Sequence, residues 1–72
     1  MIRLTINGKP RELPGPTGLL DFLRQSKIEP RTVAIEHNGE IIERDRWGEV
    51  VLQEGDQLEI VHMIGGGTQG RP

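Results

Sequence analysis

Three consecutive glycines, Gly65, Gly66 and Gly67, are the residues of this sequence whose type and spacing point most directly to chemistry. Residues 58–64 before them alternate and are rich in branched apolar side chains, which is typical of a half-buried strand. Because glycine has no Cβ, a peptide leaving such a strand can enter a slot that excludes side chains. The reactive group it can offer is a main-chain carboxylate. Glycine-rich chain ends are more often plain linkers or disordered tails, and the glycines alone favour that interpretation.

No other residues form a set that is typical of catalysis or metal binding. The sequence has no cysteine, and its only serine, Ser26, has no histidine near it in sequence to act as a base. His37 and His62 show no metal-ligand spacing; we expect His37 to be exposed beside a turn and His62 to lie on the surface of the last strand. No helix follows the glycines, so they are not a phosphate-binding loop. The sequence therefore predicts a domain that is not an enzyme and binds no metal or cofactor.

The composition limits the size of the core and the class of partner. With 72 residues, the chain is one domain near the lower limit for a single core without disulfides. Apolar residues make up 33% of it, and Phe22 and Trp47 are the only large aromatic residues, so the core must be aliphatic. The net charge of −2, with acidic and basic residues interspersed, argues against nucleic acid as a partner. No apolar run is long enough to span a membrane, and we expect a cytoplasmic protein.

The first half of the chain predicts a hairpin followed by one helix. Residues 1–7 alternate as a strand, Asn7-Gly8 supplies a tight turn, and residues 11–13 form a short returning strand. Thr17 is placed to cap a helix over residues 18–27, which Pro30 prevents from continuing. The spacing of its apolar residues predicts that four side chains share the buried face of this helix: Leu19, Leu20, Phe22 and Leu23.

The second half predicts another hairpin and the final strand. Residues 33–35 and 40–42 are short apolar strands joined by the turn signal Asn38-Gly39. A polar turn over residues 43–48 follows, and Trp47 is expected to anchor it. The apolar residues 50–52 and a turn over residues 53–56 then lead into the last strand.

Two hairpin-like halves joined by one helix give the order β-β-α-β-β. Because parallel strands need a right-handed crossover, the last strand is expected beside the first, in the middle of a mixed sheet with the helix packed on one face. This predicts an α+β protein with the β-grasp (ubiquitin-like) fold. We expect residues 1–64 to form the β-grasp domain and residues 65–72 to form a flexible, glycine-rich C-terminal tail.

Several segments in combination resemble the ThiS family, the sulfur carrier proteins of thiamine thiazole biosynthesis. The resemblance covers residues 1–67, and its parts are specific only when taken together. It rests on the following segments: Asn7-Gly8, the Leu19-Leu20-Asp21-Phe22-Leu23 helix, Val33-Ala34-Ile35-Glu36 with Asn38-Gly39, Ile42-Glu43-Arg44 with Trp47, Glu54-Gly55-Asp56, and the ending Leu58-Glu59-Ile60-Val61-His62-Met63-Ile64-Gly65-Gly66-Gly67.

The resemblance implies a protein cosubstrate that partner enzymes act on. An E1-like adenylyltransferase would use ATP to adenylate the carboxylate of Gly67, and sulfur from a cysteine desulfurase would then convert it to a thiocarboxylate. Thiazole synthase would receive this sulfur for the thiazole ring. Gly65 and Gly66 would complete the slender arm that enters each partner's active site while the domain stays outside.

Docking is expected on the exposed face of the last strand. Val61 and Met63 alternate with the residues that face the helix, and with Ile64 they are the predicted partner-binding residues. The alternative is that these are ordinary residues of the sheet surface. The roles of Trp47 beyond the turn and of His62 stay open.

Residues 68–72 depart from the family pattern, because chains that resemble this one stop at the glycines. A terminal Pro72 preceded by Arg71 would not fit a glycine-shaped slot. Either a peptidase removes these residues, or they are foreign to the natural chain, or this copy is not charged with sulfur. Three other functions stay open: a sulfur carrier for molybdopterin, cysteine or tRNA thiolation, a non-catalytic β-grasp interaction module, and a ubiquitin-like modifier.

Overall fold

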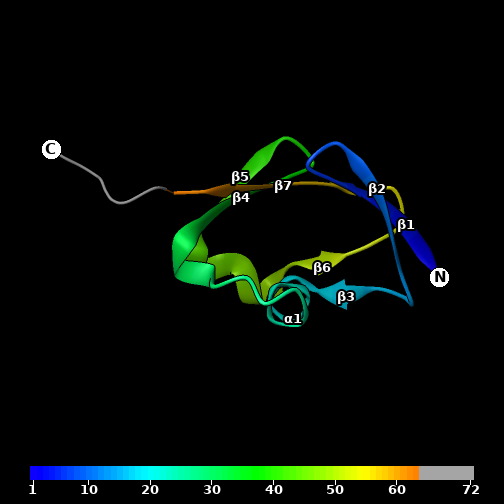
Figure 1. Ribbon diagram of the computed structural model, residues 1–72, viewed down its shortest axis with the longest axis horizontal. Coiled ribbons are helices and arrows are strands. Elements are labelled where there is room, and N and C mark those ends of the chain that lie inside the picture. The colour runs from blue at the N-terminus through cyan, green and yellow to red at the C-terminus, as the bar shows by residue number, and fades with distance from the viewer. Residues whose placement is uncertain (64–72) are drawn as a thin grey trace, which may run out of the picture.

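The computed structural model describes residues 1–63, which form a five-stranded mixed sheet with one α-helix beneath it (Figure 1). The strand order is β2-β1-β7-β4-β5, and a short two-stranded sheet pairs β3 with β6. The elements in chain order are β1 (Ile2–Ile6), β2 (Lys9–Leu13), β3 (Thr17–Gly18), α1 (Leu19–Gln25), the 3₁₀ helix η1 (Pro30–Thr32), β4 (Val33–His37), β5 (Glu40–Ile42), the 3₁₀ helix η2 (Arg44–Glu49), β6 (Val51–Leu52) and β7 (Gln57–His62).

Both predicted hairpins are present, and the same dipeptide makes each turn. Asn7 and Gly8 have φ of 52° and 81°, and Asn38 and Gly39 have φ of 53° and 85°. Two successive positive φ values are what a two-residue turn requires to match the twist of its strands. The turns fix the registers, with Ile6 opposite Lys9 in one hairpin and His37 opposite Glu40 in the other.

The last strand lies in the middle of the sheet, as predicted. β7 pairs in parallel with β1 on one side and antiparallel with β4 on the other. Main-chain bonds of 2.9 Å from Thr5 N to Asp56 O and from Asn7 N to Leu58 O join β1 to β7. The β-grasp arrangement predicted from the order of elements is therefore the observed one.

The start of the helix differs from the prediction. Gly18, not Thr17, is the N-cap residue, and no side chain caps the helix. Thr17 instead pairs with Leu52 in the small β3–β6 sheet, and its hydroxyl donates to the carbonyl of Gly15 at 2.8 Å. The pairing with β6, distant in sequence, takes Thr17 out of the capping position.

The end of the helix is set by Lys27, which adopts a left-handed conformation with φ of 59°. The N–H of Lys27 donates to Arg24 O at 3.0 Å, and the N–H of Ile28 donates to Leu23 O at 2.9 Å. These two bonds form a Schellman motif, which satisfies carbonyls that would otherwise be unpaired at the helix end. The helix therefore ends at Gln25, before Pro30 can interrupt it.

A single core fills the space between the sheet and the helix. Twelve buried residues form it: Ile2, Leu4, Leu13, Leu19, Phe22, Leu23, Val33, Ile35, Trp47, Leu52, Leu58 and Ile60. Trp47 is 2% exposed, and its indole N–H donates to Ile42 O at 2.8 Å, so it anchors η2 as predicted. Leu20 was expected in the core but is 41% exposed.

Replacing Lys27 by glycine should stabilise the protein. A side chain in the left-handed region costs energy that glycine does not pay, so Lys27→Gly should raise the free energy of unfolding by roughly 0.5–1 kcal/mol in urea denaturation. Lys9→Gly is the matched control, because Lys9 lies in β2 without a positive φ and glycine weakens a strand. Equal destabilisation by the two variants would contradict this account of the helix end.

Candidate functional site

The described residues end at Met63, immediately before the predicted reactive segment. The last described main-chain contact is the bond from Met63 N to Thr32 O at 2.8 Å, which holds the end of β7 against η1. Ile64, Gly65, Gly66 and Gly67 lie outside the described residues. The predictions that concern them therefore remain predictions, and the site that the structure describes is the base from which they leave.

Side chains of β7 alternate between the core and the exposed face of the sheet. Leu58 and Ile60 are buried, whereas Val61 and Met63 are 59% and 50% exposed. This is the placement that the alternation in the sequence predicted for Val61 and Met63. That they bind a partner stays a prediction.

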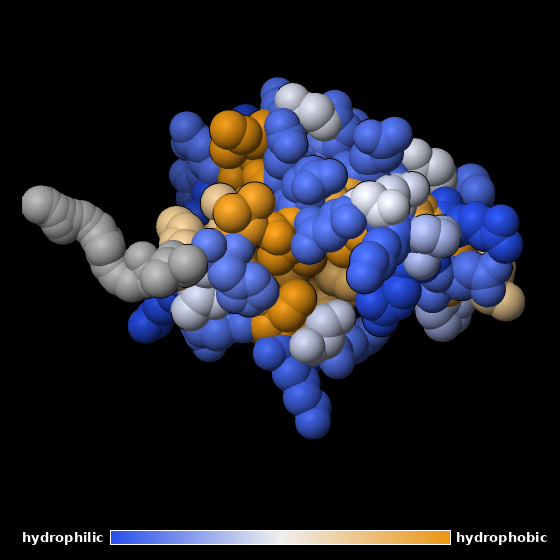
Figure 2. Space-filling model, turned by 45° about the horizontal axis from the view of Figure 1, so that its top comes forward, coloured by the Kyte–Doolittle hydropathy of each residue, from blue (hydrophilic) through white to orange (hydrophobic). Residues whose placement is uncertain are grey.

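Two residues from neighbouring strands extend this apolar surface. Ala34 on β4 is exposed directly opposite Val61, and Ile41 on β5 is 76% exposed. We call Ala34, Ile41, Val61 and Met63 the apolar patch. Figure 2 turns the sheet side of the molecule forward and shows apolar atoms gathered among polar ones there. Sequence analysis missed Ala34 and Ile41, although the period-two pattern of their strands and the Asn38-Gly39 register point them to this face.

Two carboxylates lie beside the patch on the same face. Glu36 on β4 and Glu59 on β7 are directly opposite each other. Among residues 1–63, neither takes part in an ion pair. Like charges opposed across two strands are unfavourable in isolation, so this face suits a partner that brings a cation next to an apolar contact.

A polar cluster fixes the start of β7. The His37 Nε2 atom lies 2.8 Å from Asp56 Oδ2, and Gln57 N donates to the Asn38 side-chain oxygen at 2.8 Å. His37 was expected to be exposed, but this contact leaves its side chain only 20% exposed. Burial alone would raise the pKa of the Asp56 carboxyl, but hydrogen bonds from His37, the Gln53 N–H and Asn38 lower that pKa below its ordinary value of 3.8.

Asn7 supplies the last connection between β1 and β7. Its side-chain amide donates to Ile60 O at 3.2 Å, and its side-chain oxygen accepts from Ile60 N at 2.7 Å. The carboxamide thus bonds to Ile60 as a main-chain peptide of β1 would. It extends the parallel ladder by one rung after the backbone of β1 has turned away.

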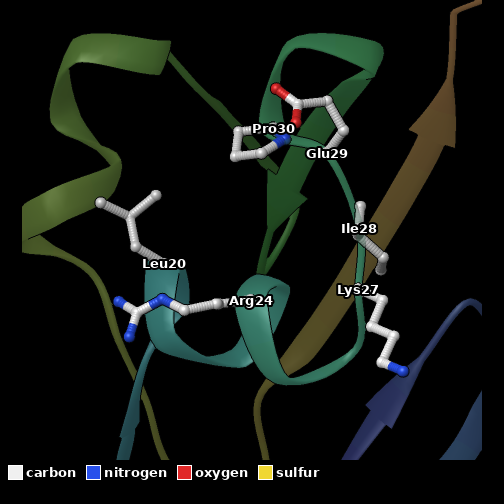
Figure 3. Close-up of a pocket in the computed structure, with 6 residues that line it drawn as sticks. All are labelled: Leu20, Arg24, Lys27, Ile28, Glu29 and Pro30. Atoms are coloured by element: carbon white, nitrogen blue, oxygen red, sulfur yellow. The ribbon is translucent and has the colours of Figure 1, made fainter.

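An open groove lies on the helix side of the molecule (Figure 3). Its lining consists of Leu20, Arg24, Lys27, Ile28, Glu29 and Pro30. Arg24 is already in an ion pair with Asp21 at 2.9 Å, and none of the lining residues belongs to β7 or to the apolar patch. One of its lining residues, Pro30, begins η1, the 3₁₀ helix against which the end of β7 is held.

In the described part of the chain, no three His, Cys, Asp or Glu side chains are grouped so that they could hold a metal ion. No helix among residues 1–63 combines the length and the apolar character that crossing a membrane requires.

Comparisons with known proteins point to one family. The model of the ThiS family matches residues 4–67. The sulfur carrier protein ThiS of Bacillus subtilis is 42% identical over 65 residues, which cover 89% of this chain and 98% of that protein. A crystal structure of the thiamine biosynthesis protein ThiS from Geobacter metallireducens superposes with a TM-score of 0.80 at 32% identity, covering 92% of this chain and 100% of that one.

Two longer proteins also match. A thiazole synthase of Magnetococcus marinus is 41% identical over 66 residues, which cover 92% of this chain. The chain spans only about a fifth of the length of this protein and of a second thiazole synthase from Paramagnetospirillum magneticum (20% and 21%). A region similar to about nine-tenths of this chain thus occurs within larger proteins of that name.

Asn7→Gly should loosen β7 at Ile60 without disturbing the turn. Glycine keeps the positive φ but removes both bonds to Ile60, so we expect the free energy of unfolding to fall by about 1–2 kcal/mol. The Ile60 amide should also exchange its hydrogen faster in NMR measurements. Asn38→Gly makes the same change in the other turn and should leave the Ile60 amide protected. Unchanged exchange in Asn7→Gly would show that the carboxamide does not hold β7.

Proposed function

The chain belongs to the ThiS family, and from this membership we propose that it is a sulfur carrier protein that supplies sulfur for thiamine biosynthesis. The observation that carries the proposal is the match with the Bacillus subtilis sulfur carrier over 98% of that protein's length. The family match extends to residue 67 and so includes all three glycines. The proposed carrier is a substrate of other enzymes and has no catalytic side chain of its own.

The reactive group in this proposal is the carboxylate of Gly67 after residues 68–72 have been removed by a peptidase. A carboxylate is a poor acyl donor, so it must first be activated. An adenylyltransferase joins the carboxylate to the adenylyl group of ATP and releases pyrophosphate. A persulfide, formed from cysteine by a desulfurase, then attacks the carbonyl carbon, and AMP leaves. A thiol reduces the resulting acyl disulfide, which releases the carrier and leaves a disulfide behind. The product is a thiocarboxylate, whose sulfur is a better nucleophile than the original oxygen.

Thiazole synthase is the proposed acceptor of this sulfur. Support comes from the thiazole synthases that contain a region similar to this chain, because a carrier joined to its acceptor stays at high effective concentration. Gly65, Gly66 and Gly67 have no Cβ atoms, so the arm can reach a closed site from which water is excluded. When the sulfur has been transferred, an oxygen atom from the acceptor or from water takes its place, and the carboxylate is restored.

The proposed docking surface is the apolar patch together with Ile64. Val61 and Met63 lie at the end of β7 that leads to the glycines, so contacts here would aim the arm at the partner's active site. Methionine suits a surface that must fit both an adenylyltransferase and a synthase, because its side chain is flexible and polarizable.

The reaction at Gly67 can be followed by intact-mass spectrometry. A chain that ends at Gly67, incubated with the adenylyltransferase, ATP and a sulfur source, should gain the mass difference between sulfur and oxygen. The 72-residue chain should not gain it until residues 68–72 are removed. A chain ending at Gly67 with Gly66→Val is the matched control, because a β-branched side chain should not pass the slot. A Gly67-ended chain that never acquires sulfur would overturn the proposed function.

A substitution at Val61 can test the docking surface without changing the stability of the fold. Val61→Asp places a charge in the apolar patch. Binding to the adenylyltransferase, measured by calorimetry, should weaken roughly tenfold or more, which is the size of effect seen when a central interface residue is changed. Because Val61 is 59% exposed, the melting temperature should change little. Gln57→Asp is the control, since it adds the same charge to the exposed face at the other end of β7. Equal binding by both variants would show that the patch is not the docking surface.

A further inference from the structure

The two edges of β7 are not covered over the same length. β4 pairs with β7 from Leu58 to His62, whereas β1 pairs with it only at Gln57 and Leu58. Figure 1 shows β7 running on past the turn between β1 and β2. The C-terminal part of β7 therefore pairs with β4 along one edge and has no paired strand along its other edge within the described residues.

The register shows which main-chain groups face each side. Two bonds flank the pairing of β4 and β7: Asn38 N donates to Gln57 O at 2.7 Å, and Met63 N donates to Thr32 O at 2.8 Å. Continued along the register between them, this pattern means that the odd-numbered residues of β7 bond to β4. In an antiparallel ladder these pairs alternate with pairs whose N–H and C=O groups point away from each other. Leu58, Ile60 and His62 therefore direct their main-chain groups toward the β1 side.

Successive rungs on the β1 side are filled in different ways. Leu58 O accepts from the backbone N–H of Asn7, and both main-chain groups of Ile60 bond to the Asn7 side chain. For His62, the next rung, no strand of the described chain lies on that side, because β1 has ended at Ile6. The carboxamide of Asn7 thus ends the ladder one rung before the last residue of β7.

We propose that the edge of β7 at His62 is a strand-addition site, on which an extended segment of thiazole synthase pairs through main-chain hydrogen bonds. The inference rests on the proposed function and specifies how the carrier is gripped there. An edge with unpaired N–H and C=O groups is a template for a further strand. The apolar patch continues onto this end of β7 at Val61 and Met63, so alternate side chains of the added strand can contact it.

Main-chain pairing suits this position because it needs no side chain from the carrier. Every second residue of an extended chain presents its N–H and C=O to the same edge. The main-chain groups of His62 point to the open edge, so an added strand can pair with them as the Asn7 side chain pairs with Ile60.

Hydrogen exchange of the chain that ends at Gly67, the proposed mature form, provides the first test. In the free protein the His62 amide should exchange faster than the amides of Ile60, which donates to the Asn7 side chain, and Val61, which pairs with β4. Addition of the thiazole synthase from the same organism should slow exchange at His62 and leave Val61 unchanged. Binding without protection of His62 would overturn this inference alone. Absence of any binding would overturn the proposed acceptor as well.

Substitution at His62 separates its backbone from its side chain. His62→Pro removes the outward N–H without touching the bonds to β4, because proline is tolerated where the N–H faces away from a partner strand. Binding to thiazole synthase should weaken roughly five- to tenfold, as expected for one lost main-chain bond. His62→Ala keeps the N–H and should bind as the wild type does. Wild-type affinity in His62→Pro, with a folded chain by NMR, would overturn the proposal.

Discussion

The parallel pairing of β1 and β7 is the contact on which the rest of the structure depends. It joins the two ends of the described chain through bonds such as Asn7 N to Leu58 O at 2.9 Å. A parallel pair needs a crossover, and here all the remaining elements together form that crossover. The helix is held under the sheet because the chain must pass there to return. The strand that leads to the glycines thereby gains neighbours on both sides.

The two Asn-Gly turns do more than reverse the chain. Each asparagine turns its side chain onto β7: Asn7 bonds to Ile60, and Asn38 accepts from Gln57 N and bonds to Asp56. A left-handed residue with a short carboxamide can satisfy main-chain groups that the turn itself leaves without a partner. The two turns therefore fix β7 near its start and near its end, which matters in a domain with a core of only twelve residues.

One face of the sheet is covered and the other is left open, an asymmetry that suits the proposed carrier function. The covered face packs into the core together with Phe22 of α1 and Trp47 of η2, and this core supplies the stability. On the open face the apolar patch and the opposed carboxylates of Glu36 and Glu59 contribute little to folding and are exposed to a partner. The domain thus combines a stable support for the end of β7 with a surface that can be covered temporarily.

The sequence by itself determined the order of the elements, the central place of the last strand and the side of β7 on which Val61 and Met63 lie. These follow from period-two patterns and turn dipeptides, which are local signals. The sequence also showed the three glycines, Gly65, Gly66 and Gly67. Their proposed role rests on family membership, because they lie beyond the described residues. Only the tertiary structure decided that Thr17 joins β6, that Lys27 ends the helix, and that Asn7 bonds to Ile60, 53 residues away. Such contacts depend on which segments meet in space, and no local pattern records that.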